Sequence, residues 1–569
     1  MAPTTDETTT QVIGSRLTAI AEEIGSTLLR AAYSPNIKQR ADRSSAIFDA
    51  SGNVIAEAQH SPMSLGSMRT TVMYLIDNPP TDGIHPGDML LANDPYTGGG
   101  QHLPDFNVLA PVFWDQKIVA YVVNIGHHSD VGGMVAGSES GACKDIFQEG
   151  LRLPLVKLVA AGEVREDIVH IIQLNSRIPD ERLGDVRAQI AANAVGVRGM
   201  EELCQRYGPE VIAASMTDLL AYGERRIRAA VAKIPDGVYE ACDHLDGTGE
   251  LVPIRLQLTV DGELLRFDFT GTHPQLANSR NVPLSATAAV VYAVVRNIVD
   301  PNLPANSGYY RAISVNAPEG SLLNPRPPGA TGERALSGGV LGDVIATALS
   351  AAIPERGMAC SGPHAQIIPS GINPRTGRVF VDYETFAGSY GARPYRDGMD
   401  AVRIHGSGGM NLPVESVEMN YPLLVERYEL IQDSGGAGTY RGGMSVRRDY
   451  RILAPGVVVS VCGERQRVAA RGLAGGADGK LGQFIAVSKG GSRQRKLKAT
   501  DTDVPLDPGD VLRVESPAGG GYGPPKDRER SRVEQDLREE RISAAVANRI
   551  FGVSRRRKAA PGPRQTSPR

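Results

Sequence analysis

The first apolar residues of the chain recur at spacings of three and four. Between residues 11 and 32 these positions are Ile13, Leu17, Ile20, Ile24 and Leu28. This period predicts an amphipathic helix, which should end before the Ser34-Pro35 step because the residue before a proline disfavours helical dihedrals. The period then changes, since two short apolar runs within residues 45–57 flank Ser51-Gly52-Asn53. That pattern predicts a β-hairpin after the helix.

Further along, strand-like and helix-like patterns alternate in blocks. Residues 86–135 contain β-like runs separated by glycine-rich and polar turns, which predicts a sheet whose loops carry the polar residues. Residues 181–234 have a helical period, 238–275 look like strands around the turn Asp261-Gly262, and helices are predicted at 284–298 and 339–352. Residues 375–520 are strand-like and rich in glycine.

These blocks predict an α+β chain of several domains, with mixed β-sheets, several helices and long loops rich in glycine and proline. The turn Pro235-Asp236-Gly237 suggests one boundary, and a second is expected near residue 430. We therefore expect an N-terminal α/β domain (1–236) with the candidate metal site, a central α+β domain (237–430) and a β-rich domain (431–525). Residues 526–569 should form a charged tail, first helical and then disordered.

Composition narrows the function classes. Of 569 residues, 61 are lysine or arginine and 64 are aspartate or glutamate, a formal charge of −3, so no basic field for nucleic acid is expected. The five cysteines form no CxxC pair, which argues against a disulfide framework or a zinc ribbon. The N-terminus has no leader pattern, and the apolar stretch near 286–295 is too short to span a bilayer. We expect a cytoplasmic protein without membrane or nucleic-acid partners.

Several widespread catalytic motifs are absent from the sequence. There is no GxxxxGK[ST], no GxGxxG after a strand, no GxSxG and no HExxH. The chain itself therefore offers no recognisable phosphate loop, serine nucleophile elbow or zincin helix.

Histidines and aspartates concentrate instead in two neighbouring segments, NDPYTGGGQHLPDFNV and NIGHHSDVGG. They contain His102, Asp105, His127, His128 and Asp130. A loop beside a strand end can bring imidazoles and a carboxylate together, the ligand set of a divalent ion such as Zn²⁺ or Mn²⁺. Consecutive strand residues face opposite ways, so at most one of the paired histidines should be a ligand. The other, with Asp130, could orient the site or carry a proton. Histidines that are merely structural are the alternative.

A second polar segment, SPNIKQRADRSSAIFDASG, lies between the predicted helix and hairpin. Arg40 and Arg43 could bind an anion there, and Asp42 could be a fourth metal ligand or a general base. An ordinary turn with salt bridges explains the same residues equally well. The isolated His60 and His273 lie near turns, where a structural role is the simpler interpretation.

The same segments, together with GDVRAQIAAN, FDFTGTHPQLANSRNVP and APEGSLLNPRPPGATGE, resemble the hydantoinase B/oxoprolinase family, in order, over residues 10–525. The resemblance implies the B-type subunit of a hetero-oligomer that opens a cyclic amide (hydantoin, 5-oxoproline or lactam), or of an acetone or acetophenone carboxylase. It implies a hydantoinase A-type partner that binds ATP with Mg²⁺. It also implies a metal pattern of His-x-x-Asp followed 25 residues after the histidine by another histidine. His102, Asp105 and His127 match that spacing, and Asp42 falls at a nearby metal-associated aspartate.

The resemblance and the residues together suggest a mechanism. The A-type subunit would activate the amide carbonyl with ATP, and metal-bound water on this chain would attack it, with His128 or Asp130 moving the proton. A ketone carboxylase subunit and a non-catalytic scaffold are the alternatives. Gly271-Thr272-His273-Pro274-Gln275 and Ser45 depart from the pattern of many relatives, which leaves the substrate open.

Overall fold

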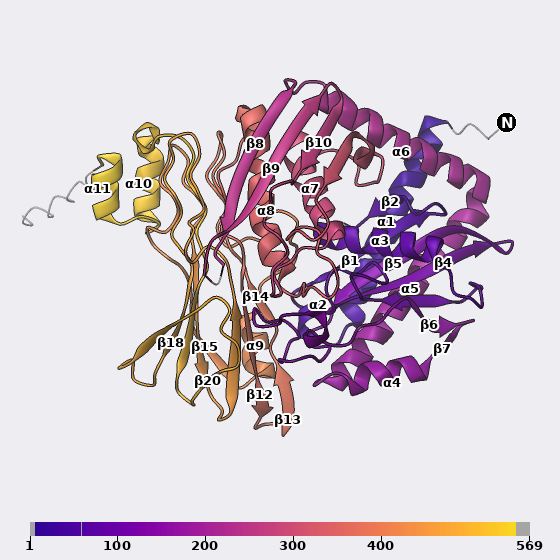
Figure 1. Ribbon diagram of the computed structural model, residues 1–569, viewed down its shortest axis with the longest axis horizontal. Coiled ribbons are helices and arrows are strands. Elements are labelled where there is room, and N and C mark those ends of the chain that lie inside the picture. The colour runs from indigo at the N-terminus through magenta and orange to yellow at the C-terminus, as the bar shows by residue number, and fades with distance from the viewer. Residues whose placement is uncertain (1–5, 59, 248, 554–569) are drawn as a thin grey trace, which may run out of the picture.

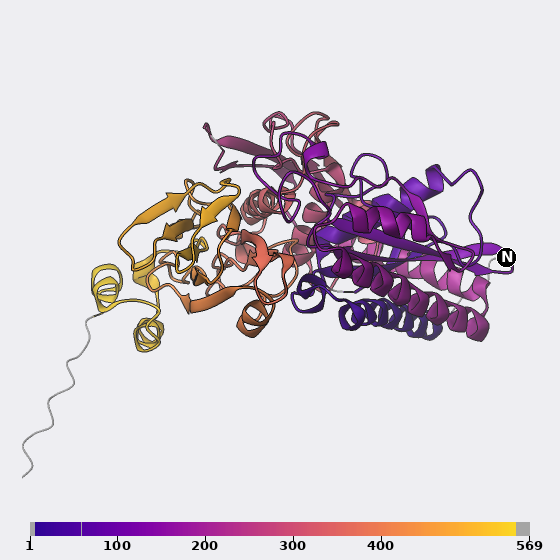
Figure 2. The ribbon, with the colours of Figure 1, turned by 90° about the horizontal axis from the view of Figure 1, so that it is seen from below.

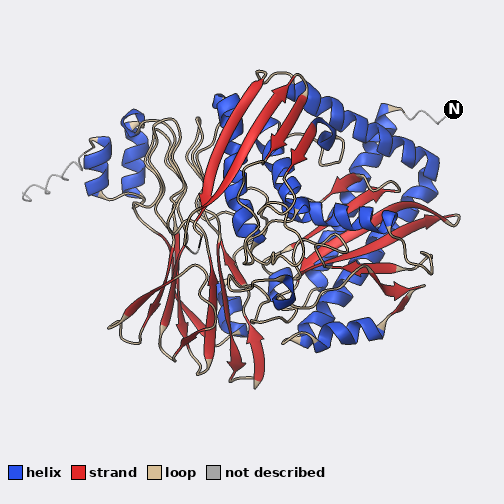
Figure 3. Ribbon diagram, in the orientation of Figure 1, coloured by secondary structure: helices blue, strands red, loops and turns tan. Residues whose placement is uncertain are grey.

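The computed structural model describes residues 6–58, 60–247 and 249–553. Figure 1 shows an elongated molecule in which the N-terminal helices and their sheet occupy one end and the strands of the C-terminal half occupy the other. Helices flank the sheets rather than forming a separate bundle, as Figure 3 makes plain. The predicted α+β class with several sheets is confirmed.

The N-terminal sheet has seven strands in the order β2-β1-β5-β4-β3-β6-β7, all paired antiparallel. Their bounds are β1 Arg43–Asp49, β2 Val54–Glu57, β3 Met89–Ala92, β4 Asp105–Trp114, β5 Lys117–His127, β6 Val156–Ala160 and β7 Glu163–Val164. The predicted hairpin is β1-β2, and the predicted sheet of residues 86–135 is β3-β4-β5.

Both faces of this sheet are covered, which explains why its strands are apolar on both sides. Ile47 and Val122 face a core built with α1 (Glu7–Ala31) and α5 (Pro179–Tyr207), on which α6 (Pro209–Val231) also packs. Phe48 and Val123 face the opposite core, built with α3 (Pro62–Asp77). Successive residues point to opposite faces of a strand. Figure 2 shows α1 and its neighbouring helices as a layer beneath the sheet. The short helices α2 (Pro35–Lys38) and α4 (Glu166–Leu174) lie at its margins.

The central part has a four-stranded sheet, β11-β10-β9-β8, with one parallel pair (β10 and β11). Its strands are β8 Gly237–Leu245, β9 Val252–Asp261, β10 Leu264–Asp268 and β11 Ile313–Asn316, and it packs against α7 (Leu284–Val299) and α8 (Arg334–Ala352). By length and composition α8 could cross a membrane, but 83% of its apolar window is buried inside the protein. Its apolar side chains therefore contact protein.

The C-terminal part contains two five-stranded sheets, β13-β12-β17-β20 with β14 paired to β12, and β15-β16-β21-β18-β19. Their strands are β12 Ala365–Asn373, β13 Arg378–Val381, β14 Glu384–Phe386, β15 Leu423–Leu430, β16 Val446–Ile452, β17 Val457–Cys462, β18 Gln483–Val487, β19 Gln494–Leu497, β20 Val504–Leu506 and β21 Val511–Glu515. Strand pairing crosses the predicted limit at residue 430, because β12 pairs with β17 and β15 with β16. The helix α9 (Val414–Asn420) packs against β15.

The charged tail begins with the helix that its composition predicts, α10 (Arg530–Arg538), and continues into a second, α11 (Ala544–Phe551). The two share a small apolar core that includes Val533 and Ala547. Arg528 anchors the tail through an ion pair of 2.7 Å with Asp397. The disorder predicted for the end of the tail concerns residues 554–569, which lie outside the described part of the chain.

Candidate metal centre

The register of the β4-β5 hairpin builds the site. Asp115 and Gln116 form its two-residue turn, and both have positive φ angles (45° and 63°), as a type I′ turn requires. The register shifts by one residue between Val112 and Phe113, and beyond this irregularity Asp105 at the start of β4 pairs directly with His127 at the end of β5. Directly opposed residues share one face of a sheet, so the turn and the register shift together fix the two side chains side by side.

His102 completes a compact group with this pair. Its Nε2 lies 3.0 Å from Asp105 Oδ2, and its ring centroid lies 4.9 Å from that of His127. One donor atom from each of His102, Asp105 and His127 lies within 4.8 Å of the other two. All three side chains are buried. The structure thus brings together the three residues whose spacing suggested metal ligation.

A carboxylate that sequence reasoning missed, Glu139, joins the group. Its Oε1 lies 2.9 Å from His102 Nδ1 and 3.3 Å from His127 Nε2, so it contacts both imidazoles. Its other oxygen accepts hydrogen bonds from Gln366 Nε2 (2.6 Å) and the Tyr383 hydroxyl (3.0 Å). Glu139 lies in the loop GSESG, which has no metal-ligand spacing. Only the fold carries it to the histidines.

The charges of the group favour a cation at its centre. Burial alone would raise the pKa of Asp105, but His102 and Arg334 hold it well below its usual range. Burial likewise opposes ionisation of Glu139, yet its contacts with His102 and His127 hold that pKa low. Burial and Arg334 lower the pKa of His102, and the two carboxylates more than restore it, so the net shift is upward. A protonated imidazole or a divalent cation can satisfy this demand.

The donor atoms also fit a metal ion. Neither contact of His102 with a carboxylate has hydrogen-bond geometry, so both of its buried ring nitrogens lack a hydrogen-bond partner among the described residues. Buried polar atoms without partners are rare and call for an explanation. Two imidazoles and a carboxylate are the ligands that Zn²⁺ and Mn²⁺ accept. The residues present therefore fit such an ion.

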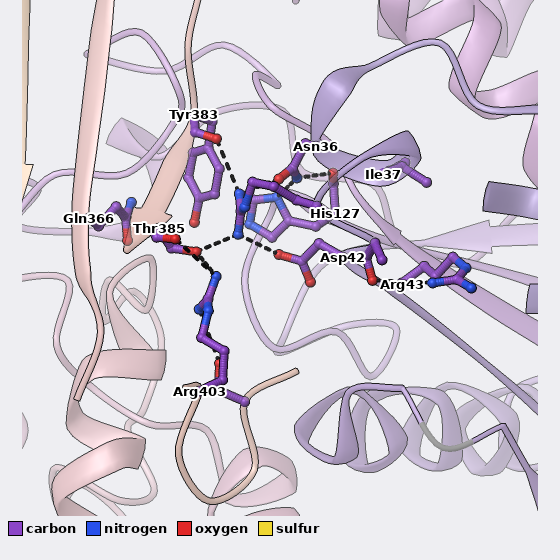
Figure 4. A network of polar contacts seen from close by, with 12 residues as sticks. Asn36, Ile37, Asp42, Arg43, His127, Gln366, Tyr383, Thr385 and Arg403 are labelled. Carbon is purple, nitrogen blue, oxygen red and sulfur yellow. Dashed lines mark hydrogen bonds and ion pairs between the residues drawn. The ribbon is translucent and has the colours of Figure 1, made fainter. Parts of the chain in front are cut away.

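Asp42 lies beside the group but outside the converging donors. Its carbonyl accepts a hydrogen bond of 3.1 Å from the His127 amide, while its carboxylate is 3.4 Å from Arg40 Nη2 and partly exposed. Asn36 connects the same elements, since its side-chain amide contacts His127 Nδ1 at 3.0 Å (Figure 4). Ligation by Asp42, and its role as a base, stay predictions.

His128 points away from the metal group, as the alternation along a strand requires. Its ring stacks on Phe106 with centroids 4.2 Å apart, and its Nε2 lies 3.0 Å from Gln189 Oε1 on α5. Burial and Arg182 lower its pKa to about 3, so the imidazole is neutral near pH 7. These contacts favour a structural role, and proton transfer by His128 stays a prediction.

Asp130 organises the loop after β5. Its carboxylate accepts hydrogen bonds from the amides of Gly137 (3.0 Å) and Arg177 (2.8 Å) and forms an ion pair of 2.9 Å with the Arg177 guanidinium. The two amide contacts hold backbone in place, and the one with Gly137 positions the segment that carries Glu139. The predicted catalytic role of Asp130 is not tested by this arrangement.

Comparisons with known proteins place the chain among its relatives. Residues 6–525 match the family model described as hydantoinase B/oxoprolinase. The chain is 32% identical to the B-type subunit of a putative D-/L-hydantoinase of a Pseudomonas species, covering 96% of this chain and 95% of that protein. It is 31% identical to the caprolactamase β-subunit of Pseudomonas jessenii (97% and 96%). It is 32% identical to 5-oxoprolinase 1 of Arabidopsis thaliana, of whose length it spans 41%.

Solved structures show the same fold. The crystal structure of the ATP-dependent caprolactamase from Pseudomonas jessenii superposes with a TM-score of 0.90 at 29% identity, covering 98% of both chains. An acetone carboxylase structure superposes with a TM-score of 0.89 at 18% identity, covering 97% of this chain and 80% of the other, and this likeness concerns the fold alone. The match along nearly the whole sequence shows that the chain belongs to the hydantoinase B/oxoprolinase family.

Proposed function

We propose that this chain is the metal-carrying B-type subunit of an ATP-dependent amidohydrolase that opens a cyclic amide such as a hydantoin, 5-oxoproline or a lactam. The observation that carries the proposal is the convergence of His102, Asp105 and His127 on one buried point. Three relatives, named as a hydantoinase component, a caprolactamase component and a 5-oxoprolinase, support the substrate class.

The residues divide the work at this site. His102, Asp105 and His127 would hold a divalent ion, Zn²⁺ or Mn²⁺, which when bound supplies a Lewis acid and lowers the pKa of water at neutral pH. Glu139 orients both imidazoles, and Gln366 and Tyr383 fix Glu139 in turn. Such supporting contacts set the orientation of metal-binding histidines. Burial of the group keeps bulk water away from the reacting carbonyl.

The ATP chemistry would belong to a partner. The sequence has no phosphate-loop motif, and two full-length relatives are named as subunits of larger enzymes. We propose that an A-type subunit uses ATP to activate the amide carbonyl, which resonance otherwise protects from attack. The activated carbonyl would then be hydrolysed at the site on this chain.

The test uses the chain co-purified with its A-type partner. Wild type should contain a divalent metal and release ADP in step with the opening of at least one cyclic amide. His102→Ala should lose both metal and amide-dependent ADP release. His170→Ala, on the exposed surface of α4, is the matched control and should keep both. Unchanged metal content and activity in His102→Ala would refute the proposed site.

The same preparation separates the alternatives. A carboxylase would release ADP only when both bicarbonate and a ketone are present, and would release none with any cyclic amide. A scaffold subunit would contain no stoichiometric metal and would tolerate His102→Ala. The assay with bicarbonate is included because the fold is similar to that of an acetone carboxylase.

A further inference from the structure

Two arginines, Arg40 fully buried and Arg403 partly exposed, meet beside the metal centre, and Asp42 is the one carboxylate among the described residues that forms an ion pair with either. Arg40 is fully buried after α2 and donates hydrogen bonds to Asn36 Oδ1, to the Tyr383 carbonyl at 3.1 Å and to Thr385 Oγ1. Its only ion pair is the distant one with Asp42, at 3.4 Å, and its Nε has no partner in the described chain.

Arg403 approaches the same hydroxyl from the other side, as Figure 4 shows. Its Nη2 donates to Thr385 Oγ1 and to the Thr385 carbonyl at 3.3 Å, and its Nη1 lies 3.3 Å from Ser407 Oγ. Within the described residues no carboxylate comes within 4.0 Å of its guanidinium, and its Nε is unpartnered. Burial and the charge of Arg40 lower the pKa of Arg403 to about 10. Two guanidinium groups thus converge on one neutral oxygen.

This pair adjoins the metal centre. Asn36 accepts from Arg40 and contacts His127 with the same side-chain amide. Tyr383 connects the two groups as well, because its carbonyl accepts from Arg40 while its hydroxyl donates to Glu139. The buried His364 is close enough to the pair to be affected by it, since burial, Arg403 and Arg40 all lower its pKa. Asn36 and Tyr383 therefore connect the arginine pair to the candidate ligands.

Arg403 and Asp42 are partly exposed, and the glycine-rich loop 406–409 runs alongside. A Cβ added at Gly409 would lie 3.2 Å from the Arg40 carbonyl and 3.9 Å from Arg403 Nη2. A side chain at position 409 would crowd the backbone of Arg40, and the φ angle of +105° also favours glycine there.

We propose that Arg40 and Arg403 form an anion subsite that holds the phosphoryl group of an activated substrate beside the metal centre. Planar guanidinium groups bind phosphate oxygens through paired, charge-assisted hydrogen bonds. The oxygens of a phosphoryl group would accept hydrogen bonds from the guanidinium N–H groups of both arginines, which Thr385 Oγ1 now satisfies only in part. The subsite rests on the proposed function for its biological ligand, but its affinity for phosphate does not depend on amide hydrolysis. Of the two arginines that the sequence singled out for an anion, Arg43 is otherwise engaged, since its Nε donates to the Gly25 carbonyl at 2.6 Å.

The first test measures binding of inorganic phosphate to the full metal-loaded chain by isothermal titration, with acetate and bicarbonate as competing probes. Wild type should bind phosphate, and Arg403→Gln should weaken it at least tenfold while metal content stays unchanged. Arg403→Lys should recover part of the loss. Arg393→Gln is the matched control, because Arg393 is similarly exposed but stacks on Tyr390. Equal affinity in Arg403→Gln and wild type, or preference for bicarbonate over phosphate, would overturn the subsite.

The second test uses only the wild-type protein, so its result cannot arise from a misfolded variant. Phenylglyoxal modifies accessible arginines, and peptide mapping of wild-type protein should show that phosphate slows labelling of Arg403 but not of Arg393. Labelling unaffected by phosphate would overturn the proposal. If phosphate binds as expected but no cyclic amide is opened by the complex, the subsite stands and the proposed hydrolase function fails.

Discussion

Glu57→Gln should stabilise the protein at alkaline pH and not at acidic pH. Glu57 ends β2 and is buried. Its Oε1 lies 3.4 Å from Arg296, and its Oε2 has no hydrogen-bond partner in the described chain. Burial, which outweighs the attraction of Arg296, raises the pKa of this carboxyl from 4.5 to about 7.

The sign follows from proton binding. Between pH 4.5 and 7 the folded protein keeps a proton on Glu57 that the unfolded chain has released, so stability falls as pH rises through this window and is constant above it. Each pKa unit corresponds to 1.36 kcal/mol, so the full loss is about 3 kcal/mol, an upper limit for one buried carboxyl. Glutamine has nearly the same shape and cannot ionise. The variant should therefore gain up to about 3 kcal/mol over wild type at pH 8 and little at pH 4.5.

The assay is thermal unfolding of both proteins at several pH values from 5 to 8. The midpoint difference between Glu57→Gln and wild type should grow with pH and level off above 7. Glu263→Gln, on the exposed turn after β9, is the control and should show no such growth. A difference that is independent of pH, or a wild type that is the more stable at pH 8, would refute the burial argument.

Three further predictions concern the site and its frame. Glu139→Gln should weaken divalent-metal binding roughly 10- to 100-fold in a titration, because an amide holds the two imidazoles less strongly; unaltered affinity would contradict its positioning role. His128→Asn should lower the midpoint of thermal unfolding yet leave metal content intact, since the His128 side chain contacts Gln189 on α5 and Phe106. Loss of metal in this variant would indicate that His128 takes part in metal binding. Gly100→Ala should destabilise the fold by about 1–3 kcal/mol, because its Cβ would lie 1.9 Å from the Asn93 carbonyl oxygen; a midpoint equal to that of wild type would contradict this contact.

Local pattern was enough to predict much of the N-terminal half. Periodicity predicted α1, the β1-β2 hairpin and the long helices α5 and α6, because each has one continuous apolar face or alternation. The strand alternation even separated His127 from His128 correctly. The proximity of Asp105 to His127 was predictable because both belong to one hairpin, whose pairing is local.

Long-range contacts could not be predicted in this way. Glu139 reaches the histidines through an irregular loop, and Arg334 arrives at Asp105 from the start of α8. Tyr383 and Thr385 come from a different sheet altogether. No periodicity or residue spacing in a single sequence predicts these long-range contacts, because they depend on how the sheets pack against one another. The predicted limit near residue 430 could not take such pairing into account, since β12 pairs with β17 across it.

The two-residue turn and the register shift near Val112 together set Asp105 opposite His127, so the effect of an insertion or deletion on the centre depends on its place in the hairpin. Residues added at the tip, around Asp115-Gln116, would leave the ladder below untouched and lengthen only the outer end of the hairpin. A single deletion inside β5 would instead slide the strand by one position and exchange the faces of His127 and His128. Natural insertions and engineered fusions should therefore be tolerated at the tip and excluded from the strands.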